Sequence, residues 1–420
     1  MKIWIVTIGE PIINNKDKLR LHRHGLLADY ISKNSSYNIV WWTSSFNHFT
    51  KTFEFSNSKN LFPRKNLEIK TLKGFGYKKN VSLSRIIDHK MVSMLFAKKI
   101  KKNKEKPDII ITSFPPLGLC KEAVNYGIRN NVPVIIDYRD LWPEAFQDLF
   151  PKKINLLAKI IFYPLTFKTK KVLAKATGII GITDKFLEIA LNKINRNKNK
   201  FDSYFYHTYK KLNINQEDQN ECISFWKKMG IQGDSNYINV CFFGTLGHQF
   251  DLATVINGFK QVSNLKIKLI ICGSGHKKNE LIKLAEGQEN IIFPGYMNAN
   301  QIKVLLSHSH IGLCPYLPKK MFLNAIPGKV IEYMSEGLEL LTTLNDGMVG
   351  EMVNKNNFGI NYNAFDKDSF SLSLRQLYQK IKDRKNNKES IMHYYNVNYD
   401  QETVLKKYLH HIEKVIKDYA

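Results

Sequence analysis

The chain lacks the cysteine and membrane features that would place it in several familiar classes of protein. Its cysteines include no C-x-x-C pair, and most lie beside apolar residues: Cys120, Cys222, Cys241, Cys272 and Cys314. This pattern predicts buried thiols in a reducing compartment and disfavours a disulfide scaffold or a zinc site. No apolar run reaches the roughly 18 residues that span a bilayer. The apolar start of the chain is too short for a secretory signal, so we expect an intracellular protein.

Two common nucleotide-binding motifs are also missing. Neither G-x-x-x-x-G-K-[ST] nor G-x-G-x-x-G follows a predicted strand. A P-loop NTPase and a simple nicotinamide dehydrogenase are therefore disfavoured.

Acidic residues are scarce. The 420 residues contain 37 Asp and Glu against 63 Lys and Arg, which gives a formal net charge of +26. Such a charge favours polyanions as partners, namely nucleic acid, an anionic bilayer or phosphorylated substrates. Much of the excess is Lys beside Asn, so a coding bias is an alternative explanation. A hydrophobic content of 43% with 12% aromatics excludes bulk disorder.

Short apolar runs alternate with helical patterns through both halves of the chain. This alternation predicts an α/β protein with parallel sheets covered on both faces. We predict strands at Ile3–Thr7, Asn38–Thr43, Asp108–Thr112, Val132–Asp137, Gly178–Thr183, Tyr237–Phe243, Lys266–Cys272, Asn290–Phe293, Ile311–Cys314, Leu338–Thr343 and Phe358–Tyr362. We predict helices near Lys18–Lys33, Ser82–Lys102, Leu117–Arg129, Ile154–Ala176, Ile223–Met229, Leu252–Val262, Lys278–Ala285, Asn300–Ser307, Pro327–Ser335, Lys367–Lys382 and Glu402–Tyr419.

The length and the two βα series predict two doubly wound domains that face a cleft. The polar segment Asn192–Lys200 marks the boundary, so we assign residues 1–200 to the first domain and 201–400 to the second. The predicted C-terminal helix, 402–419, has an apolar face that we expect to pack back on the first domain.

The segment Ala325–Gly337 carries the strongest functional pattern. Pro327 suits the first turn of a helix and Gly337 its C-terminal cap. The free amides of Gly328 and Lys329, the helix dipole and the Lys329 ammonium together attract a phosphate or diphosphate. Glu332 lies one turn further on the same face, where it could bind ribose hydroxyls. An ordinary amphipathic helix with solvated charges is the alternative.

Glycine-containing turns follow three predicted strands of the second domain. Ligands of open α/β sheets bind beyond the carboxyl ends of the strands, where such turns lie. Glycine lets the backbone approach a ligand closely or adopt positive φ. We therefore include these turns in a candidate binding site: Gly244, Thr245, Leu246, Gly247, Gly273, Ser274, Gly275, Gly295 and Tyr296.

The first domain offers a second set of candidates at its strand ends. Asp137, Arg139 and Asp140 share one loop, where they could orient hydroxyls or a phosphate; an internal Arg–Asp pair that fixes the loop is the alternative. Further candidates follow the first strand and open the next helix: Gly9, Glu10, Arg20, His22 and His24.

A basic, aromatic segment lies at Leu156–Lys175, and more lysines occur elsewhere in the first domain. Lysines among aromatic residues are typical of surfaces that dock on anionic membranes. A core helix with a solvated Lys face is the alternative.

At these motifs the chain resembles the retaining, family 4 glycosyltransferases of the GT-B fold. It is most similar to the bacterial branch that builds O-antigen and capsule repeat units. Five segments carry the resemblance, which covers nearly the whole chain: Leu19–Ala28, Val40–Phe49, Asp137–Pro143, Phe243–Gly247 and Pro327–Met334.

The resemblance implies roles for particular residues. In that family two glutamates with seven residues between them mark the donor site. The second corresponds to Glu332, and the first position holds Asn324, which cannot carry charge. No basic residue occurs between Gly244 and Asp251, where the family often has a pair, so diphosphate stabilisation would fall on Lys329. Glu351 resembles another donor-domain position.

The sequence and this resemblance therefore predict an enzyme that moves a sugar from a nucleotide sugar to a polyprenyl-diphosphate-linked saccharide. We expect the nucleotide to be UDP. We expect it to act in the cytoplasm on the anionic inner face of the plasma membrane, with no metal or other cofactor and no nucleic acid. Lys329, Glu332, Asn324, Asp140 and Arg139 are the predicted catalytic residues. One alternative is another enzyme of the same fold, a nucleotide-sugar epimerase. The non-enzymatic alternative is a basic nucleic-acid-binding protein.

Overall fold

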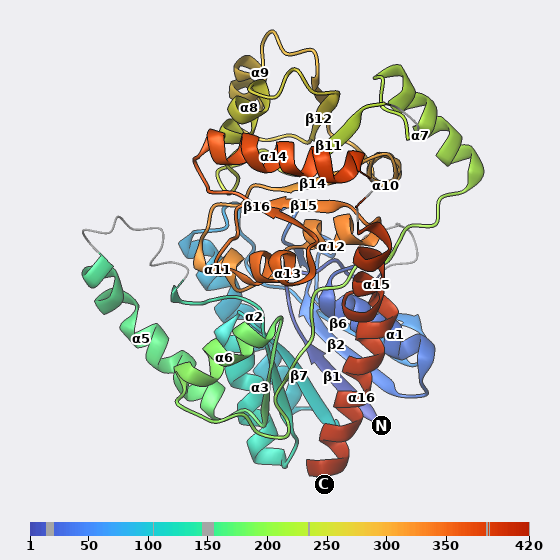
Figure 1. The fold of residues 1–420 in the computed structure, drawn as a ribbon. Helices are drawn as coiled ribbons and strands as arrows, with labels where there is room; N and C mark the ends of the chain where they lie inside the picture. The colour runs from blue at the N-terminus through green and yellow to red at the C-terminus, as the bar shows by residue number, and fades with distance from the viewer. Residues whose placement is uncertain are drawn as a thin grey trace. The chain divides into compact units, whose positions relative to one another are not determined.

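The computed structural model describes residues 1–13, 21–103, 105–144, 155–233, 236–383, 385 and 387–419, with the backbone alone for 155–159. The chain divides into two compact units (Figure 1). Unit 1 is Met1–Tyr206 with Leu405–Ala420, and unit 2 is His207–Val404.

Unit 1 is built on an eight-stranded sheet in the order β10-β9-β8-β7-β1-β2-β6-β5. All neighbours pair in parallel except β5 and β6. The strands are β1 (Lys2–Val6), β2 (Asn38–Ser44), β5 (Asn60–Arg64), β6 (Leu67–Leu72), β7 (Ile109–Phe114), β8 (Val134–Tyr138), β9 (Gly178–Gly181) and β10 (Ser203–Tyr204), with a separate hairpin of β3 (Phe46–Asn47) and β4 (Thr52–Phe53).

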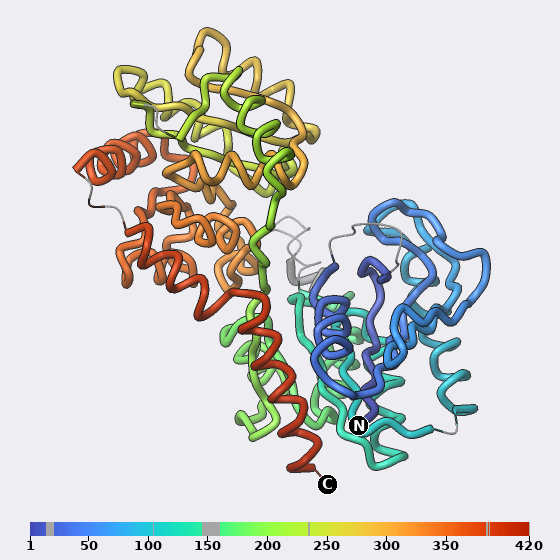
Figure 2. Tube along the Cα trace, turned by 90° about the vertical axis from the view of Figure 1, so that its right-hand side faces the viewer, coloured from blue at the N-terminus to red at the C-terminus, as the bar shows by residue number. Residues whose placement is uncertain are grey.

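Helices cover both faces of this sheet. Helices α2, α3 and α5 lie together on one face, since α3 contacts both of the others, and α1 and α16 lie on the other (Figures 1 and 2). The helices of unit 1 are α1 (Arg23–Asn34), α2 (Leu83–Lys101), α3 (Leu117–Asn130), α5 (Asn155–Ala174), α6 (Asp184–Lys193) and α16 (Gln401–Tyr419). The last of these, red in Figure 2, joins unit 1 from the far end of the sequence.

Unit 2 is built on a six-stranded, fully parallel sheet in the order β13-β12-β11-β14-β15-β16. In chain order this reads 3-2-1-4-5-6, which is the Rossmann arrangement. Its elements are β11 (Ile238–Phe243), β12 (Ile267–Cys272), β13 (Ile291–Gly295), β14 (Ile311–Cys314), β15 (Glu339–Thr342), β16 (Gly359–Asn361), α7 (Gln216–Lys228), α8 (Leu252–Lys260), α9 (Lys278–Leu284), α10 (Ala299–Ser307), α11 (Lys320–Leu323), α12 (Gly328–Ser335), α13 (Met348–Asn356), α14 (Lys367–Lys382) and α15 (Lys388–Asn398).

The prediction of an α/β chain with two parallel sheets is confirmed. The inner strands, such as β1, β7, β11 and β14, consist largely of Ile, Val, Leu and aromatic residues, and nearly all of their side chains are buried. That burial on both faces explains the continuous apolar runs in the sequence. The five cysteines are free and buried, as their apolar neighbours predicted.

The sequence analysis placed the end of the first domain too early. The segment expected to be a polar break begins inside α6, and β10 follows it and pairs with β9. Unit 1 therefore extends to Tyr206. Helix α7 also begins earlier than predicted, at Gln216, because Asn215 caps it by accepting a hydrogen bond from the backbone N–H of Asp218.

Each sheet has one position where successive strands diverge to opposite sides, between β1 and β7 in unit 1 and between β11 and β14 in unit 2. Ligands of doubly wound sheets bind beyond the carboxyl ends of the strands at such positions. The two candidate sites are therefore sought at these two edges.

Candidate functional site

The glycine turns of unit 2 pack against one another at the carboxyl edge of the sheet. Leu246 N–H donates to the carbonyl of Ser274 (2.8 Å), and Gly273 N–H donates to that of Gly295 (2.7 Å). Gly244, Gly273 and Gly275 have φ values of +133°, +141° and +154°, which only glycine adopts readily. The predicted turns thus form one backbone-lined surface at the switch point.

Gly273 shows why glycine is required there. A Cβ at this position would lie 1.8 Å from the carbonyl oxygen of Gly244. We expect Gly273→Ala to lower the free energy of unfolding by roughly 1–3 kcal/mol and to weaken nucleotide binding, because the β11 and β12 loops must separate. Gly287→Ala is the control, since Gly287 has φ of +76° but no atom within 4 Å of an added Cβ. Equal losses in the two variants, measured by urea unfolding, would contradict the packing argument.

Lys329 places its amino group at the same surface. Helix α12 begins at Gly328, one residue later than predicted, with Pro327 as its extended N-cap residue. The Lys329 side chain crosses to Gly244, where an added Cβ would lie 2.6 Å from Nζ. Nζ is also 4.6 Å from the centre of the Phe250 ring and 5.4 Å from that of Phe242. The cation of α12 therefore lies beside the turn that follows β11.

The environment of Lys329 disfavours its charge. Burial lowers the pKa of Lys329, and the nearby Cys314 and Glu332 only partly oppose this effect. No ion pair of Lys329 occurs within the described residues. An anion bound beside Gly244 would stabilise the protonated amine, so the geometry suits a phosphate ligand.

The other predicted donor-side residues differ in exposure. Glu332 lies one turn along α12 and is 7% exposed. Tyr296 is 78% exposed after β13, and Glu351 is exposed in the first turn of α13. Asn324 ends α11, where its amide donates to the carbonyl of Lys320 (2.7 Å).

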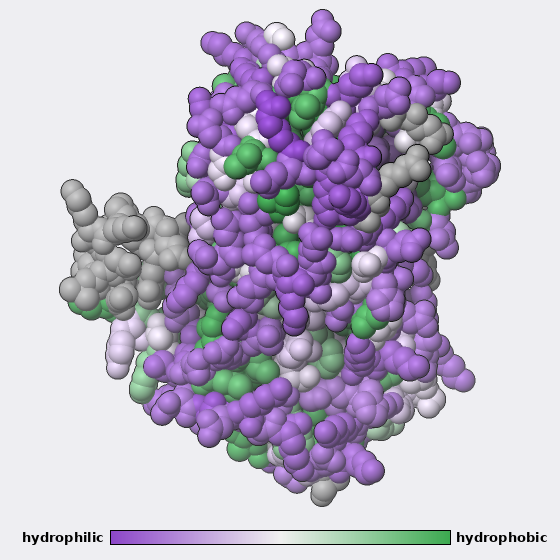
Figure 3. Space-filling model, in the orientation of Figure 1, coloured by the Kyte–Doolittle hydropathy of each residue, from purple (hydrophilic) through white to green (hydrophobic). Residues whose placement is uncertain are grey.

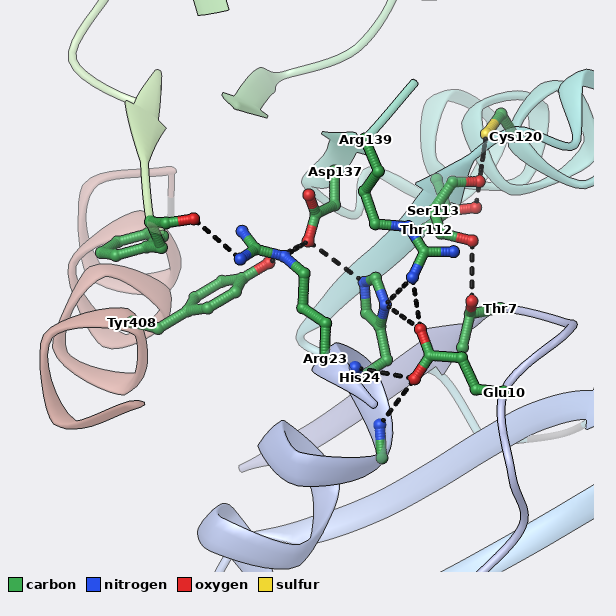
Figure 4. Close-up of polar contacts among 12 residues, drawn as sticks. Thr7, Glu10, Arg23, His24, Thr112, Ser113, Cys120, Asp137, Arg139 and Tyr408 are labelled. Atoms are coloured by element: carbon green, nitrogen blue, oxygen red, sulfur yellow. Dashed lines mark hydrogen bonds and ion pairs between the residues drawn. The ribbon is translucent and has the colours of Figure 1, made fainter. Parts of the chain in front are cut away.

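Unit 1 contains a buried polar network at the carboxyl edge of its sheet (Figure 4). Glu10, beyond β1, accepts hydrogen bonds from the backbone N–H groups of His24 (2.9 Å) and Gly25 (3.1 Å) at the start of α1. Its carboxylate also contacts His24 Nδ1 (3.0 Å) and pairs with the Arg139 guanidinium. Glu10 thus fixes the helix start and holds Arg139 at the edge.

Asp137 is the second carboxylate of this network and is fully buried at the end of β8. Its Oδ2 accepts hydrogen bonds from Arg23 Nε (2.6 Å) and from the hydroxyl of Tyr408 on α16 (3.2 Å), and it lies 3.3 Å from His24 Nε2. Burial raises the pKa values of both carboxyls, but neighbouring positive and hydrogen-bonding groups lower them by more. These groups are Arg23 and His24 at Asp137, and Arg139 and His24 at Glu10. Both pKa values lie well below the ordinary range, so both groups are ionised.

Four of the candidate residues of the first domain therefore lie together in the structure: Glu10, His24, Asp137 and Arg139. Arg139 pairs with Glu10, which differs from the internal Arg–Asp pair considered as the alternative. Asp137 is held inside the network, and we assign it a positioning role.

Three further candidates lie around the network, and one lies outside the described residues. Asp140 follows Arg139, and its buried Oδ1 has no hydrogen-bond partner among the described residues. Burial raises the pKa of Asp140, against the effects of the Leu141 backbone and of Arg139 and Arg85. His22 is the N-cap residue of α1, and Gly9 has φ of +78° in the turn beyond β1. Arg20 lies outside the described residues.

Sequence reasoning missed two members of this network. Arg23 stands between two predicted candidates, and its guanidinium also donates to the carbonyl of Phe205 (2.7 Å). Tyr408 lies on the apolar face of the predicted C-terminal helix, 402–419, and was not among the candidate site residues. Its ring stacks on Phe205 with centroids 4.4 Å apart. A hydroxyl on an otherwise aliphatic face was the available signal for a buried polar partner.

Within the described residues, no group of three or more His, Cys, Asp and Glu side chains is arranged to hold a metal ion. Among the helices in the described ranges, none combines the length and apolar character needed to cross a bilayer.

Comparison with known proteins agrees with this geometry. Residues 226–392, within unit 2, match the family Glycosyl transferases group 1. No curated protein matches the sequence significantly.

Solved structures resemble the chain over nearly its full length. Sucrose-phosphate synthase from Thermosynechococcus elongatus has 11% identity and a TM-score of 0.70, and the match covers 99% of each chain. A glycosyltransferase from Rickettsia africae has 13% identity, a TM-score of 0.64 and coverage of 100% of this chain and 98% of the other. HepE from Anabaena in complex with UDP and glucose has 11% identity, a TM-score of 0.61 and coverage of 99% and 100%.

The fold is GT-B, with two Rossmann-like α/β domains, as predicted. The match of residues 226–392 to the family Glycosyl transferases group 1 supports a glycosyltransferase as the enzyme class. Retention, membership of family 4 and the O-antigen branch stay predictions.

Proposed function

We propose that the protein transfers a sugar, with retention, from a UDP-sugar to a polyprenyl-diphosphate-linked saccharide during O-antigen or capsule synthesis. The observation that carries the proposal is the position of Lys329 Nζ beside Gly244 at the switch point of a Rossmann sheet. The structure of HepE in complex with UDP and glucose supports a UDP-linked donor.

The donor diphosphate would bind between the start of α12 and the turn after β11. Helix α12 directs its unpaired N–H groups and positive dipole end toward this position. Negative charge develops on the diphosphate as the glycosidic bond breaks, and the Lys329 ammonium would stabilise that charge. Glu332 would accept hydrogen bonds from the ribose hydroxyls, while Asn324 and Glu351 would contact the remainder of the donor. No metal enters this scheme.

The acceptor would bind at the edge of unit 1. Arg139 would contact its phosphate or hydroxyl oxygens, and the free Oδ1 of Asp140 would accept a hydrogen bond from the attacking hydroxyl. Glu10 and His24 position Arg139 for this contact. Asp137 acts one step further away, through Arg23 and His24.

The same unit would attach the enzyme to the anionic inner face of the plasma membrane. The basic segment around α5 exposes apolar side chains to solvent: Ile160 (63%), Ile161 (59%), Tyr163 (65%) and Phe167 (46%). Lys168, Lys170 and Lys171 follow on the same helix. This pattern favours a membrane surface over a core helix.

Incubation with UDP-sugars, with and without a polyprenyl-diphosphate-linked sugar, tests the function. Release of UDP only in the presence of the lipid acceptor is the expected result. A new UDP-sugar formed without acceptor would instead indicate an epimerase. Salt-sensitive RNA binding with neither reaction would indicate a nucleic-acid-binding protein.

The role of Glu332 gives a specific prediction for donor binding. We expect Glu332→Ala to weaken UDP binding about tenfold, or about 1.4 kcal/mol, because ribose hydroxyls lose a charged acceptor. Isothermal titration calorimetry with UDP measures this change. Glu336→Ala is the control, since Glu336 lies one turn further on and pairs with Lys303 of α10. UDP affinities that match in wild type and Glu332→Ala would remove Glu332 from the donor site.

A further inference from the structure

A second group of cations lies in unit 1, outside the network described above. Two cations lie near the ring of Tyr77. Lys51 belongs to the turn between β3 and β4, and Arg85 to the first turn of α2. Lys51 Nζ is 5.0 Å and Arg85 Cζ 5.6 Å from the ring centre. Both also donate to Asn80, Lys51 to its side-chain oxygen (2.5 Å) and Arg85 to its carbonyl (2.7 Å). Two positive charges are thus held close together by uncharged groups.

Neither cation forms an ion pair with a carboxylate within the described residues. Arg85 Nε is buried without a hydrogen-bond partner there. Burial and the charge of Arg85 lower the pKa of Lys51. Asp88 and Asp140 are the nearby acids, and burial raises the pKa of each. Asp88 already accepts a hydrogen bond from Gly76 N–H (2.8 Å). The excess positive charge is therefore available to a ligand.

The neighbouring histidines respond to the same positive field. Burial, together with Lys51 and Arg85, lowers the pKa of His48 to about 4. Burial and Arg85 lower the pKa of His89 to about 3. Both imidazoles are neutral near pH 7, so Lys51 and Arg85 carry the positive charge of the group. His48 Nδ1 lies 2.6 Å from the Tyr77 hydroxyl and helps to fix that ring.

The start of helix α2 adds a third element. Ser82 caps the helix by accepting a hydrogen bond from Arg85 N–H (3.3 Å), and the first turn contains no acidic residue. The positive end of this 19-residue helix therefore coincides with the two cations. The arrangement suits a ligand with two or more negative charges, such as a diphosphate.

The same helix exposes an apolar face next to the cations. Its outward side chains include Leu83 (77% exposed), Ile86 (62%), Ile87 (51%), Met91 (42%) and Met94 (63%). Their spacing of one, three and four residues places them along one side of the helix. The face of the molecule drawn in Figure 3 is mainly polar, with smaller apolar areas among the polar residues. The only acidic residue of α2, Asp88, is buried, so the surface around this face is basic.

We propose that the first half of α2, together with Lys51, binds an isoprenyl diphosphate. The diphosphate would contact Lys51 and Arg85, and the hydrocarbon chain would lie on the apolar side chains of α2: Leu83, Ile86, Ile87, Met91 and Met94. This inference rests on the proposed function, because it assigns the anchoring part of the lipid-linked acceptor to a site. Arg85 also lies close enough to Asp140 to affect its pKa. The carrier would therefore be bound beside the candidate acceptor residues.

Binding of farnesyl diphosphate tests the proposal. The full chain is titrated by calorimetry with UDP present at saturation, so that the donor site is occupied. Inorganic diphosphate and farnesol are titrated in parallel to separate the two parts of the ligand. We expect Arg85→Gln and Lys51→Gln each to weaken farnesyl diphosphate binding at least tenfold. The double substitution Ile86→Ser with Ile87→Ser should weaken farnesyl diphosphate binding but leave binding of inorganic diphosphate unchanged.

Matched controls lie on the neighbouring helix α3. Arg129→Gln and Lys121→Gln remove the same charges from exposed positions, and both should bind as wild type does. Melting temperatures show that each variant is folded. Equal affinities of Arg85→Gln and Arg129→Gln for farnesyl diphosphate would overturn the proposal. Equal wild-type affinities for farnesyl diphosphate and inorganic diphosphate would also overturn it, since a lone phosphate group would then explain the site.

A transfer assay separates this inference from the proposed function. Arg85-dependent binding of farnesyl diphosphate without transfer to a lipid-linked sugar would support the site and contradict the function. Transfer to the lipid-linked sugar with the same acceptor KM in wild type and Arg85→Gln would support the function and overturn the site.

Discussion

Replacing Lys329 by methionine is expected to slow sugar transfer at least tenfold, which corresponds to about 1.4 kcal/mol of lost transition-state stabilisation. Lys329 is the cation that lies beside Gly244 and the start of α12, where the leaving diphosphate would be held. Methionine keeps the stem that packs near Phe250 and Phe242, so the melting temperature should stay close to that of wild type. Steady-state kinetics with a saturating acceptor measures the effect.

Two comparisons sharpen the Lys329 result. Lys283→Met removes an exposed lysine from α9 and should leave turnover unchanged. Burial lowers the pKa of Lys329, so wild-type activity should fall with rising pH before the ordinary lysine value of 10.5 is reached. The methionine variant should lack that alkaline decrease. Wild-type rates in Lys329→Met would exclude the ammonium from the reaction.

Replacing Asp137 by alanine is expected to lower the free energy of unfolding by about 3–5 kcal/mol. The substitution leaves the Arg23 guanidinium buried without its carboxylate, and the Tyr408 hydroxyl loses its acceptor. Urea unfolding followed by circular dichroism measures the change. Glu188→Ala, at an exposed position on α6, should change stability by less than about 0.5 kcal/mol. A similar small change in Asp137→Ala would show that the network does not stabilise unit 1.

This stabilisation should depend on pH in a defined direction. The pKa values of Asp137 and Glu10 are lower in the folded chain than in the unfolded chain. Their contribution is therefore fully present above about pH 5 and is lost as the pH falls toward the folded-state values. The difference in melting temperature between wild type and Asp137→Ala should accordingly shrink between pH 6 and pH 3. A difference that stays constant would contradict the lowered pKa values.

The sequence predicted most of the inner strands because burial on both faces demands continuous apolar residues. The strands predicted at Asp108–Thr112 and Lys266–Cys272 were identified for this reason, and they correspond to β7 (Ile109–Phe114) and β12 (Ile267–Cys272). The inner strand β6 was missed because its buried residues are interrupted by half-buried ones and form no such run. The edge strands β5 and β10 were missed because an edge strand needs no such run. Strand β5 contains Pro63, and β10 is two residues long. Helices α6, α11, α13 and α15 were also missed, since short or polar helices carry few repeats of the apolar pattern.

The candidate sites were predictable to the extent that they depend on backbone. Glycines after strands and the proline before α12 are visible in the sequence, and the structure places them at one sheet edge. The partners of buried charges were not predictable. Asp137 meets Tyr408, which lies 271 residues away in the sequence, and no local pattern specifies such a pair. The position of the Lys329 amine at Gly244 likewise depends on the order of the strands.

The return of α16 to unit 1 has a consequence for how the protein is made. The ribosome synthesises residues 1–206 first, yet Tyr408 and its neighbours on α16 complete the core of that unit. Domains commonly fold during translation as their last residues emerge. Here the half of the molecule that is synthesised first must wait, with Asp137 and Phe205 uncovered, until the other half has been translated in full.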